Sequence, residues 1–135
     1  MKKLILFILF SSFLTFFCNA QEYIYKDVSC KEAYELIQEY KDYTNFVIVD
    51  LRPKIMYNAK HIENSLCVEC ISDNLDKYLE SIDKDKTYLI YCAIGKRSKT
   101  TFEKMKELNF KTVYHLYQGL REWNKQGYNV VSSGN

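Results

Sequence analysis

The chain has 135 residues, of which 47% are hydrophobic and 16% aromatic, with four glycines and one proline. This composition suits a single globular domain with a sizeable core and excludes a disordered, low-complexity or collagen-like chain. Lys and Arg number 19 against 17 Asp and Glu, and this near-neutral balance argues against a general nucleic-acid binder.

The N-terminal segment has the pattern of a secretory signal, because the charged start Met1–Lys3 precedes an apolar run of 14 residues at 4–17. A helix needs about 20 apolar residues to span a bilayer, so this run is too short for a membrane helix. Small residues follow the run, and we expect cleavage after Ala20. Residues 1–20 are therefore predicted to be a signal peptide, and residues 21–135 a mature domain that is periplasmic or secreted.

Cleavage would remove two of the 19 basic side chains and leave a mature domain with no net charge. Lipidation at Cys18 is the alternative, although the bulky Phe17 before it argues against a lipoprotein signal. Contact with a membrane is then expected only during export or through that lipid. The four remaining cysteines would lie in a compartment where disulfides persist, but they are too few to replace a hydrophobic core.

Beyond residue 20, short β-branched or aromatic runs alternate with amphipathic stretches, which predicts an α/β fold with about five strands and four or five helices. The expected strands are, in chain order, 23–25, 46–49, 66–68, 88–91 and 113–116. The runs at 46–49 and 88–91 are apolar throughout, as in parallel strands covered on both faces. Three helices are expected to start at the N-caps Ser29, with Glu32 completing a capping box, Ser72 and Ser98, and a last helix lies between Gly119 and Gly127.

The loop after the strand at 88–91 carries the candidate chemistry. It reads Cys92-Ala93-Ile94-Gly95-Lys96-Arg97 and leads into the helix expected from Ser98. Ligands of open parallel sheets bind beyond the carboxyl ends of the strands, and the N–H groups of such a loop can converge on an anion. A helix N-terminus and nearby cations also lower the pKa of a thiol. We therefore interpret Cys92 as a nucleophilic thiolate rather than a buried apolar cysteine.

Three stretches of the chain together resemble a rhodanese domain, over nearly the whole mature sequence. They are Val49–Pro53 followed by His61-Ile62, the pattern Cys-x-x-Gly-x-Arg-Ser at Cys92–Ser98, and Leu116–Leu120 with Trp123 and Gly127. The resemblance implies a three-layer α/β/α fold with a mainly parallel sheet of about five strands.

The resemblance also implies a single-domain sulfurtransferase of the thiosulfate:cyanide type. Cys92 would take the outer sulfur of a donor such as thiosulfate or a polysulfide as a persulfide and pass it to cyanide or a thiol. The implied substrate-binding residues are Ala93, Ile94, Gly95, Lys96 and Arg97. Six residues from Cys92 to Arg97 match the sulfurtransferases of this fold, whereas the related phosphatases have one more. No cofactor or metal is expected, and the protein is expected to be a monomer.

The chain departs from the family pattern at several places near the expected site. Where the pattern has an acidic residue, glycines and an alanine, this chain has Met56, Lys60, Asn64, Ser65 and Gln118. These departures concern substrate contacts and the shape of turns, because none of them touches the nucleophile.

Other candidate residues are interpreted as structural. Asp50 and Arg52 are expected to pair near the site, with a direct catalytic part as the alternative. His61 is interpreted as a turn residue, His115 as a strand side chain without chemistry, and Trp123 as a core residue.

Two alternative functions remain open at this point. The first is a sulfur carrier or binding module that accepts sulfur without turnover. The second is a dithiol oxidoreductase that uses Cys67 and Cys70, although a Cys-x-x-Cys motif normally opens a helix, whereas Cys67 lies in an expected strand. The pairing of these two cysteines and Cys30 cannot be deduced from the sequence.

Overall fold

The computed structural model describes residues 21–69 and 74–133. The expected signal peptide with Cys18, the expected N-cap Ser72 and Cys70 lie outside the described residues. Among the residues that are described, no helix is long and apolar enough to cross a membrane.

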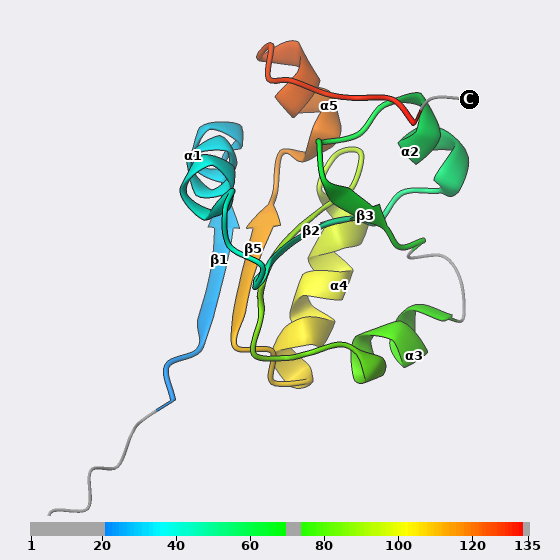
Figure 1. The fold of residues 1–135 in the computed structure, drawn as a ribbon. Helices are drawn as coiled ribbons and strands as arrows, with labels where there is room; N and C mark the ends of the chain where they lie inside the picture. The colour runs from blue at the N-terminus through cyan, green and yellow to red at the C-terminus, as the bar shows by residue number, and fades with distance from the viewer. Residues whose placement is uncertain (1–20, 70–73, 134–135) are drawn as a thin grey trace, which may run out of the picture.

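The described residues form five strands and five helices (Figure 1). In chain order they are β1 (Ile24–Val28), α1 (Cys30–Tyr40), β2 (Phe46–Asp50), α2 (Lys54–Ala59), β3 (Ser65–Cys67), α3 (Asn74–Ser81), β4 (Thr87–Tyr91), α4 (Lys96–Glu107), β5 (Thr112–Leu116) and α5 (Gly119–Lys125). The strands form one sheet in the order β1-β5-β4-β2-β3, and every pair is parallel. The predicted α/β fold with a sheet of about five strands is therefore confirmed.

Helix α1 begins as its sequence predicts. The Ser29 hydroxyl accepts the Glu32 N–H at 3.3 Å, and the Glu32 carboxylate accepts the Ser29 N–H at 2.9 Å, so the capping box is complete. Each contact satisfies a backbone donor that the first turn of a helix cannot use. This cap fixes where the chain leaves β1 and turns into the helix.

Beyond shifts of one residue at strand ends, the structure differs from the sequence-based expectation in two boundaries and one additional helix. β1 runs on to Val28 because it pairs with β5 over five positions, up to Leu116. Helix α2 was not expected; it follows Pro53, whose φ of −53° suits the start of a helix. Helix α4 begins at Lys96 and not after Ser98, because Gly95 takes the N-cap position in a left-handed conformation.

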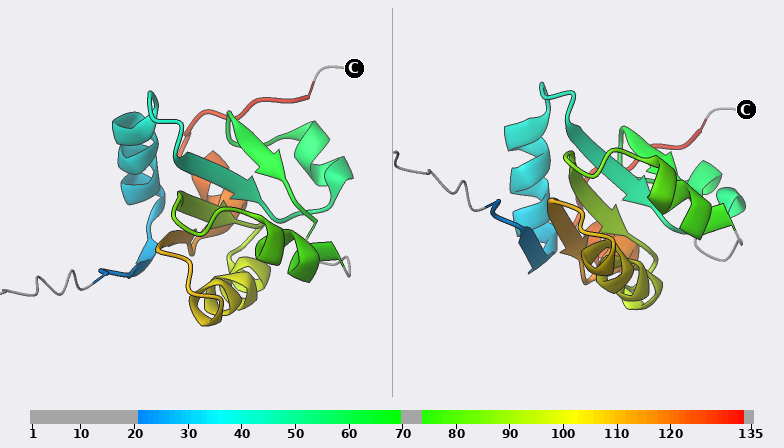
Figure 2. Two further views of the ribbon diagram at one scale, coloured as in Figure 1. Left: turned by 60° about the horizontal axis from the view of Figure 1, so that its bottom comes forward. Right: turned by 90° about the horizontal axis from the view of Figure 1, so that it is seen from below.

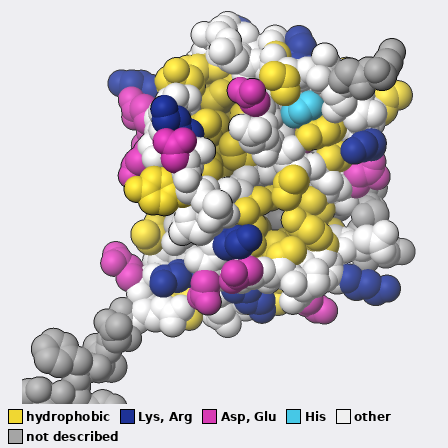
Figure 3. Space-filling view, viewed as in Figure 1, with side chains coloured by type: hydrophobic (Ala, Val, Ile, Leu, Met, Phe, Trp, Pro, Cys, Tyr) yellow, Lys and Arg dark blue, Asp and Glu magenta, His cyan; other side chains and the backbone are white. Residues whose placement is uncertain are grey.

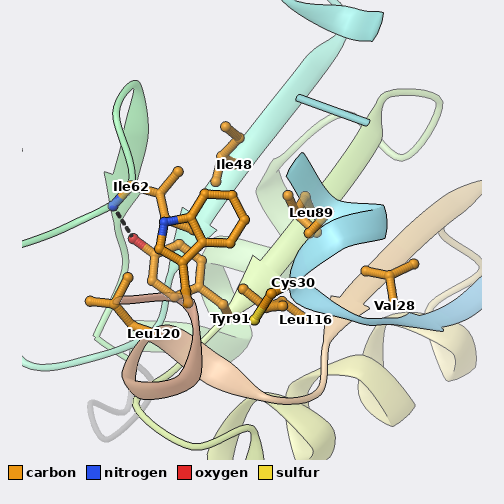
Figure 4. Packing of buried hydrophobic residues seen from close by; sticks show 10 residues of the cluster. Val28, Cys30, Ile48, Ile62, Leu89, Tyr91, Leu116 and Leu120 are labelled. Carbon is orange, nitrogen blue, oxygen red and sulfur yellow. Dashed lines mark hydrogen bonds between the residues drawn. The ribbon is translucent and has the colours of Figure 1, made fainter. Parts of the chain in front are cut away.

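Two layers of helices cover the sheet, with α1 and α5 on one face and α3 and α4 on the other (Figure 2). Under α1 and α5, buried side chains of the sheet pack against Cys30, Ala33 and Leu120 (Figure 4). Trp123 belongs to this cluster and is 2% exposed, which confirms its predicted core position. The opposite cluster joins β4 to Leu79, Phe102 and Met105, and it also contains Cys92.

The surface reflects the balanced composition. On the face seen in Figure 3, acidic and basic side chains are interspersed around hydrophobic ones. This face has no large region of one charge sign. Attraction of a charged ligand therefore depends on the side chains near its binding site more than on the charge of the whole domain.

Because all five strands are parallel, their carboxyl ends lie at one edge of the sheet. The segments that leave β2, β4 and β5 there carry Arg52, Cys92 and Tyr117. This edge therefore brings together stretches that are up to 65 positions apart in sequence, and it is where an open parallel sheet binds ligands.

Candidate active site

Cys92 follows the last residue of β4 and lines a pocket of about 640 Å³. Only 2% of the residue is exposed, so a small molecule reaches its sulfur through this pocket. The other lining residues come from the Cys92 loop, the segment after β2, α2, α4 and α5, and they are Arg52, Met56, Ala93, Ile94, Lys96, Arg97, Thr100 and Arg121. Of the substrate-binding residues implied by the resemblance, all but Gly95 line the pocket.

Gly95 has a different task, because it lies against the turn that follows β5. A Cβ atom at Gly95 would stand 1.8 Å from the Tyr117 carbonyl oxygen, and its φ of +83° is left-handed. Gly119 lies close to the other end of the loop, since a Cβ there would stand 2.5 Å from the Ala93 carbonyl oxygen. Both positions need glycine for space as well as for conformation.

Hydrogen bonds from the start of α5 hold the Cys92 loop in place. The N–H of Leu120 donates to the Cys92 carbonyl at 2.9 Å, and the N–H of Arg121 donates to the Ala93 carbonyl at 3.0 Å. Because these two carbonyls point toward α5, the loop is held in a conformation in which its N–H groups can point toward the sulfur.

Four donors surround the Cys92 sulfur. The Ser98 hydroxyl lies 3.3 Å and the Ser98 N–H nitrogen 3.4 Å from Sγ, and the N–H groups of Ile94 and Arg97 also donate to it. Burial raises the pKa of the Cys92 thiol, but these hydrogen bonds together outweigh burial, so the pKa lies below its ordinary value. The arrangement therefore favours a thiolate in a nearly closed site.

The pocket is positively charged. Lys96 and Arg97 open α4, and Arg121 lies in α5; within the described residues, none of the three pairs with a carboxylate. The pocket lining, as far as it is described, contains no acidic residue. Such a pocket attracts an anion to the sulfur.

Asp50 and Arg52 form a buried ion pair beside this pocket. Arg52 Nη2 donates to Asp50 Oδ2 at 2.7 Å and to the Lys60 carbonyl at 2.5 Å, while the Arg52 N–H donates to Asp50 Oδ1 at 3.0 Å. The carboxylate balances the guanidinium charge and holds its plane fixed. Arg52 thus offers the pocket a positioned donor but little net charge.

The prediction that Ser98 caps α4 is wrong. Ser98 lies in the first turn of the helix, and it is fully buried. Its hydroxyl contacts Cys92 Sγ, the Gly95 carbonyl at 3.2 Å and a ring nitrogen of His115. Gly95 replaces it as N-cap because the loop must curve tightly enough to turn its amides toward the sulfur.

His115 was expected to be a strand side chain without chemistry, and the structure adds a contact that this expectation missed. Its Nε2 lies 2.8 Å from the Ser98 oxygen, and its Nδ1 lies 2.7 Å from Asp27 Oδ1. Asp27 and His115 stand opposite each other in the paired strands β1 and β5. No local pattern signals this link, because 88 residues separate the two side chains.

The departures from the family pattern are accommodated by local contacts. Asn64 adopts a left-handed φ of +62°, which asparagine tolerates better than most residues. The Ser65 hydroxyl is hydrogen-bonded to the Tyr91 hydroxyl at 3.1 Å, and the Gln118 side-chain oxygen accepts the Cys30 N–H at 2.8 Å. Met56 lines the Cys92 pocket, so it is the departure that bears on substrate contacts.

His61 lies between α2 and β3, outside both elements. Its ring stacks on Tyr57 with 3.8 Å between the ring centroids, and its backbone forms an isolated bridge with Val131. The position is structural, and it fastens the C-terminal segment to α2.

The other described cysteines differ from Cys92. Cys30 and Cys67 are free thiols, and burial raises the pKa of Cys30 to about 11 and raises that of Cys67 as well. The Cys67 thiol donates to the Arg52 carbonyl at 3.7 Å. A raised pKa is the opposite of what a redox nucleophile requires. Among the described residues, no group of three His, Cys, Asp or Glu side chains could hold a metal ion.

The fold and the site together define a class of protein, a parallel α/β domain with a cysteine in an amide-lined loop after a central strand. The model of the family described as rhodanese-like domain matches residues 29–126. The chain belongs to the rhodanese-like domain family, as the three sequence stretches predict.

Known proteins support this assignment. The chain is 35% identical over 100 residues to the thiosulfate sulfurtransferase GlpE of Coxiella burnetii, which covers 74% of this chain and 88% of that protein. A rhodanese-related protein from Thermoplasma volcanium has a similar crystal structure, with a TM-score of 0.67 and 25% identity, covering 79% of this chain and 98% of that one. A rhodanese-like domain protein from Staphylococcus aureus has the same fold, with a TM-score of 0.62, 23% identity, and coverage of 79% and 99%.

Proposed function

We propose that the protein is a sulfurtransferase that moves sulfane sulfur from an anionic donor to a thiophilic acceptor through a persulfide on Cys92. The single observation that carries this proposal is the set of donors around the Cys92 sulfur, which lowers its pKa at the base of a positively charged pocket. The similarity to a thiosulfate sulfurtransferase points to the same class of chemistry.

With thiosulfate as donor, the first step forms the persulfide. The Cys92 thiolate attacks the outer sulfur, a new sulfur–sulfur bond forms, and the bond between the two donor sulfurs breaks. Sulfite leaves with that electron pair. The N–H groups of Ile94, Arg97 and Ser98 stabilise the anionic sulfur, which is the role that preorganised amides have wherever negative charge develops.

The second step transfers the sulfur to the acceptor and restores the Cys92 thiolate. The acceptor, cyanide or a thiolate, attacks the outer sulfur of the persulfide, and the bond to Cys92 breaks with its electron pair on the cysteine sulfur. The products are thiocyanate, or a persulfide of the acceptor, and the Cys92 thiolate. These two steps need no organic cofactor or metal, since each is the attack of a nucleophile on a sulfur atom with a sulfur-centred leaving group.

Lys96, Arg97 and Arg121 would hold the donor, because thiosulfate is a dianion and the pocket offers cations and donors. Arg52, fixed by Asp50, would hydrogen-bond the donor without adding much charge. We also propose that the domain acts outside the cytoplasm, on the basis of the signal-like sequence at residues 1–20, and that it acts as a single copy.

Thiocyanate formation from thiosulfate and cyanide tests the proposal, with Cys92→Ala as the variant and Cys67→Ala as the matched control. We expect turnover in the wild type and the control and none in Cys92→Ala. Mass spectrometry after thiosulfate treatment should show one added sulfur, about 32 Da, on Cys92. Turnover retained in Cys92→Ala would exclude the mechanism.

The same experiments separate the alternative functions. A sulfur carrier would gain one sulfur on Cys92 without repeated turnover. A dithiol oxidoreductase would keep thiol-oxidation activity after loss of Cys92 and lose it in Cys67→Ala, an outcome that the raised pKa of Cys67 argues against.

A further inference from the structure

Behind the nucleophile, side chains from three elements form a continuous chain of hydrogen bonds. Ser98 Oγ of α4 lies 3.3 Å from Cys92 Sγ and 2.8 Å from His115 Nε2 on β5. His115 Nδ1 lies 2.7 Å from Asp27 Oδ1 on β1. The Asp27 side chain is 47% exposed and borders a second pocket of about 650 Å³. This series of hydrogen bonds thus connects the buried Cys92 sulfur to solvent by a route separate from the Cys92 pocket.

The donors and acceptors that each side chain offers determine which atoms of this hydrogen-bonded series carry a proton. The Asp27 carboxylate only accepts hydrogen bonds, so His115 Nδ1 carries a proton. In the neutral imidazole Nε2 is then an acceptor, and it takes the one proton of the Ser98 hydroxyl. The Cys92 thiol can donate its proton to the Ser98 oxygen at the same time, and every group is satisfied.

A thiolate at Cys92 changes these requirements. The thiolate accepts hydrogen bonds and needs the Ser98 proton for itself. Ser98 can donate to sulfur only if Nε2 no longer requires that proton, and this holds when Nε2 is itself protonated. The protonated Nε2 then donates to the Ser98 oxygen or to the Gly95 carbonyl, which lies 3.2 Å away.

We propose that Ser98, His115 and Asp27 form a relay that takes up the proton of Cys92 when the thiolate forms. The thiol proton passes to the Ser98 oxygen while the Ser98 proton passes to His115 Nε2. The S–H bond and the original O–H bond break, with their electron pairs staying on sulfur and oxygen, and a new O–H and an N–H bond form. Ser98 touches the reacting sulfur, whereas His115 and Asp27 are positioning residues.

The charged groups around His115 determine how readily its ring takes up a proton. Asp27 faces it from β1, and Lys99 of α4 lies 3.2 Å from Asp27 Oδ2. On α4 the Phe102 ring stacks on the imidazole, and on β4 the apolar Ile90 is its neighbour. Burial lowers the pKa of His115, and Asp27 counteracts this only in part, so the ring is neutral beside a neutral thiol. A thiolate on the other side of Ser98 favours the imidazolium, because opposite charges stabilise each other.

The pH dependence of Cys92 alkylation by iodoacetamide tests the relay, with the modified cysteine identified by peptide mass spectrometry. His115→Gln keeps a polar side chain but cannot take up the proton, and we expect its alkylation midpoint to rise and its rate at pH 6 to fall by about tenfold or more. Asp27→Asn, at a half-exposed position, should change both in the same direction by less. Glu103→Gln is the matched control, because this carboxylate also pairs with Lys99 at 3.2 Å and is 48% exposed but does not contact His115; its profile should match the wild type.

The reciprocal measurement follows the His115 ring nitrogens by NMR in the wild type and in Cys92→Ala. Coupled sites affect each other equally, so His115 should become protonated at higher pH in the wild type than in the variant. Identical titrations in the two proteins would overturn the relay, as would an unchanged alkylation midpoint in both His115→Gln and Asp27→Asn. If His115→Gln fails to fold, the NMR comparison and Asp27→Asn still decide the matter.

This inference rests on the proposed function only in taking Cys92 as the nucleophile, and the two fail in different ways. Sulfur transfer with an unaltered alkylation midpoint in the relay variants would refute the relay and leave the function standing. A shifted midpoint in a protein that forms no persulfide would do the reverse.

Discussion

Replacing Gly95 by alanine tests whether the contact between the Cys92 loop and the turn after β5 shapes the site. The new Cβ would stand 1.8 Å from the Tyr117 carbonyl oxygen and 2.7 Å from its carbon, at a φ of +83°. Both neighbouring atoms belong to the backbone, so no side chain can move aside. The loop and the turn must separate for the methyl group to fit.

The cost follows from what that separation breaks. An L-residue in a left-handed conformation costs about 1 to 2 kcal/mol. Moving the loop away from α5 also strains the hydrogen bonds from the N–H groups of Leu120 and Arg121, at 2.9 and 3.0 Å, each of which contributes about 1 kcal/mol. We therefore expect Gly95→Ala to lower the free energy of unfolding by about 3 kcal/mol, which for a domain of this size lowers Tm by roughly 10 °C.

Gly127→Ala is the matched control for this experiment. Gly127 has nearly the same φ of +82°, but an added Cβ would meet no atom within 4 Å. Gly127→Ala should therefore be destabilised only by the conformational cost, about 1 to 2 kcal/mol. Urea unfolding of both variants, followed by circular dichroism, measures the difference. Equal destabilisation of the two would refute the idea that close approach to Tyr117 is what requires glycine at position 95.

Two further predictions concern charge. Arg121→Gln should raise the KM for thiosulfate roughly threefold to fivefold with little change in kcat, as expected for one partly exposed charge. Lys125→Gln, on the same helix but outside the pocket, should change neither KM nor kcat. A KM equal to that of the wild type in both variants would exclude Arg121 from donor binding. Hydrogen bonds from the Ser29 N–H, Lys26 and the Ser29 hydroxyl lower the pKa of Glu32 to about 2 from its ordinary 4.5, so its contribution to stability is present above pH 4.5 and is lost as the pH falls toward 2. Acid unfolding of Glu32→Gln should depend less steeply on pH in that range, and a slope as steep as that of the wild type would contradict the capping box as a source of acid sensitivity.

The sequence predicts the centre of the fold better than its edge. The strands β2 and β4 are covered on both faces and therefore have uninterrupted apolar sequences. β1 is an edge strand with a single partner, and its Lys26 and Asp27 interrupt the pattern, so only its first half could be expected. Helix α2 is short and has no buried residue, and a helix without an apolar stripe leaves no periodic signal.

In the site too, residues that are contiguous in sequence could be predicted, whereas those brought together by tertiary packing could not. The Cys92 loop could be predicted because its thiol, glycine and cations are contiguous. The contribution of Arg121 depends on how α5 follows the turn after β5, and the link from Asp27 to His115 depends on strand pairing across 88 positions. The local preference of serine for the N-cap predicts a helix that starts after Ser98, but tertiary packing starts the helix three residues earlier and turns the Ser98 hydroxyl toward the sulfur.

The order of the elements along the chain determines when the Cys92 site can be completed. β1 pairs only with β5, and the Cys92 loop is held by N–H groups at the start of α5. Synthesis proceeds from the N-terminus, and Cys92 precedes both β5 and α5 in the chain, so the strand and the helix that anchor its surroundings are the last elements to be made. A chain that ends before α5 would therefore carry the cysteine without the hydrogen bonds from Leu120 and Arg121 that hold its loop in place.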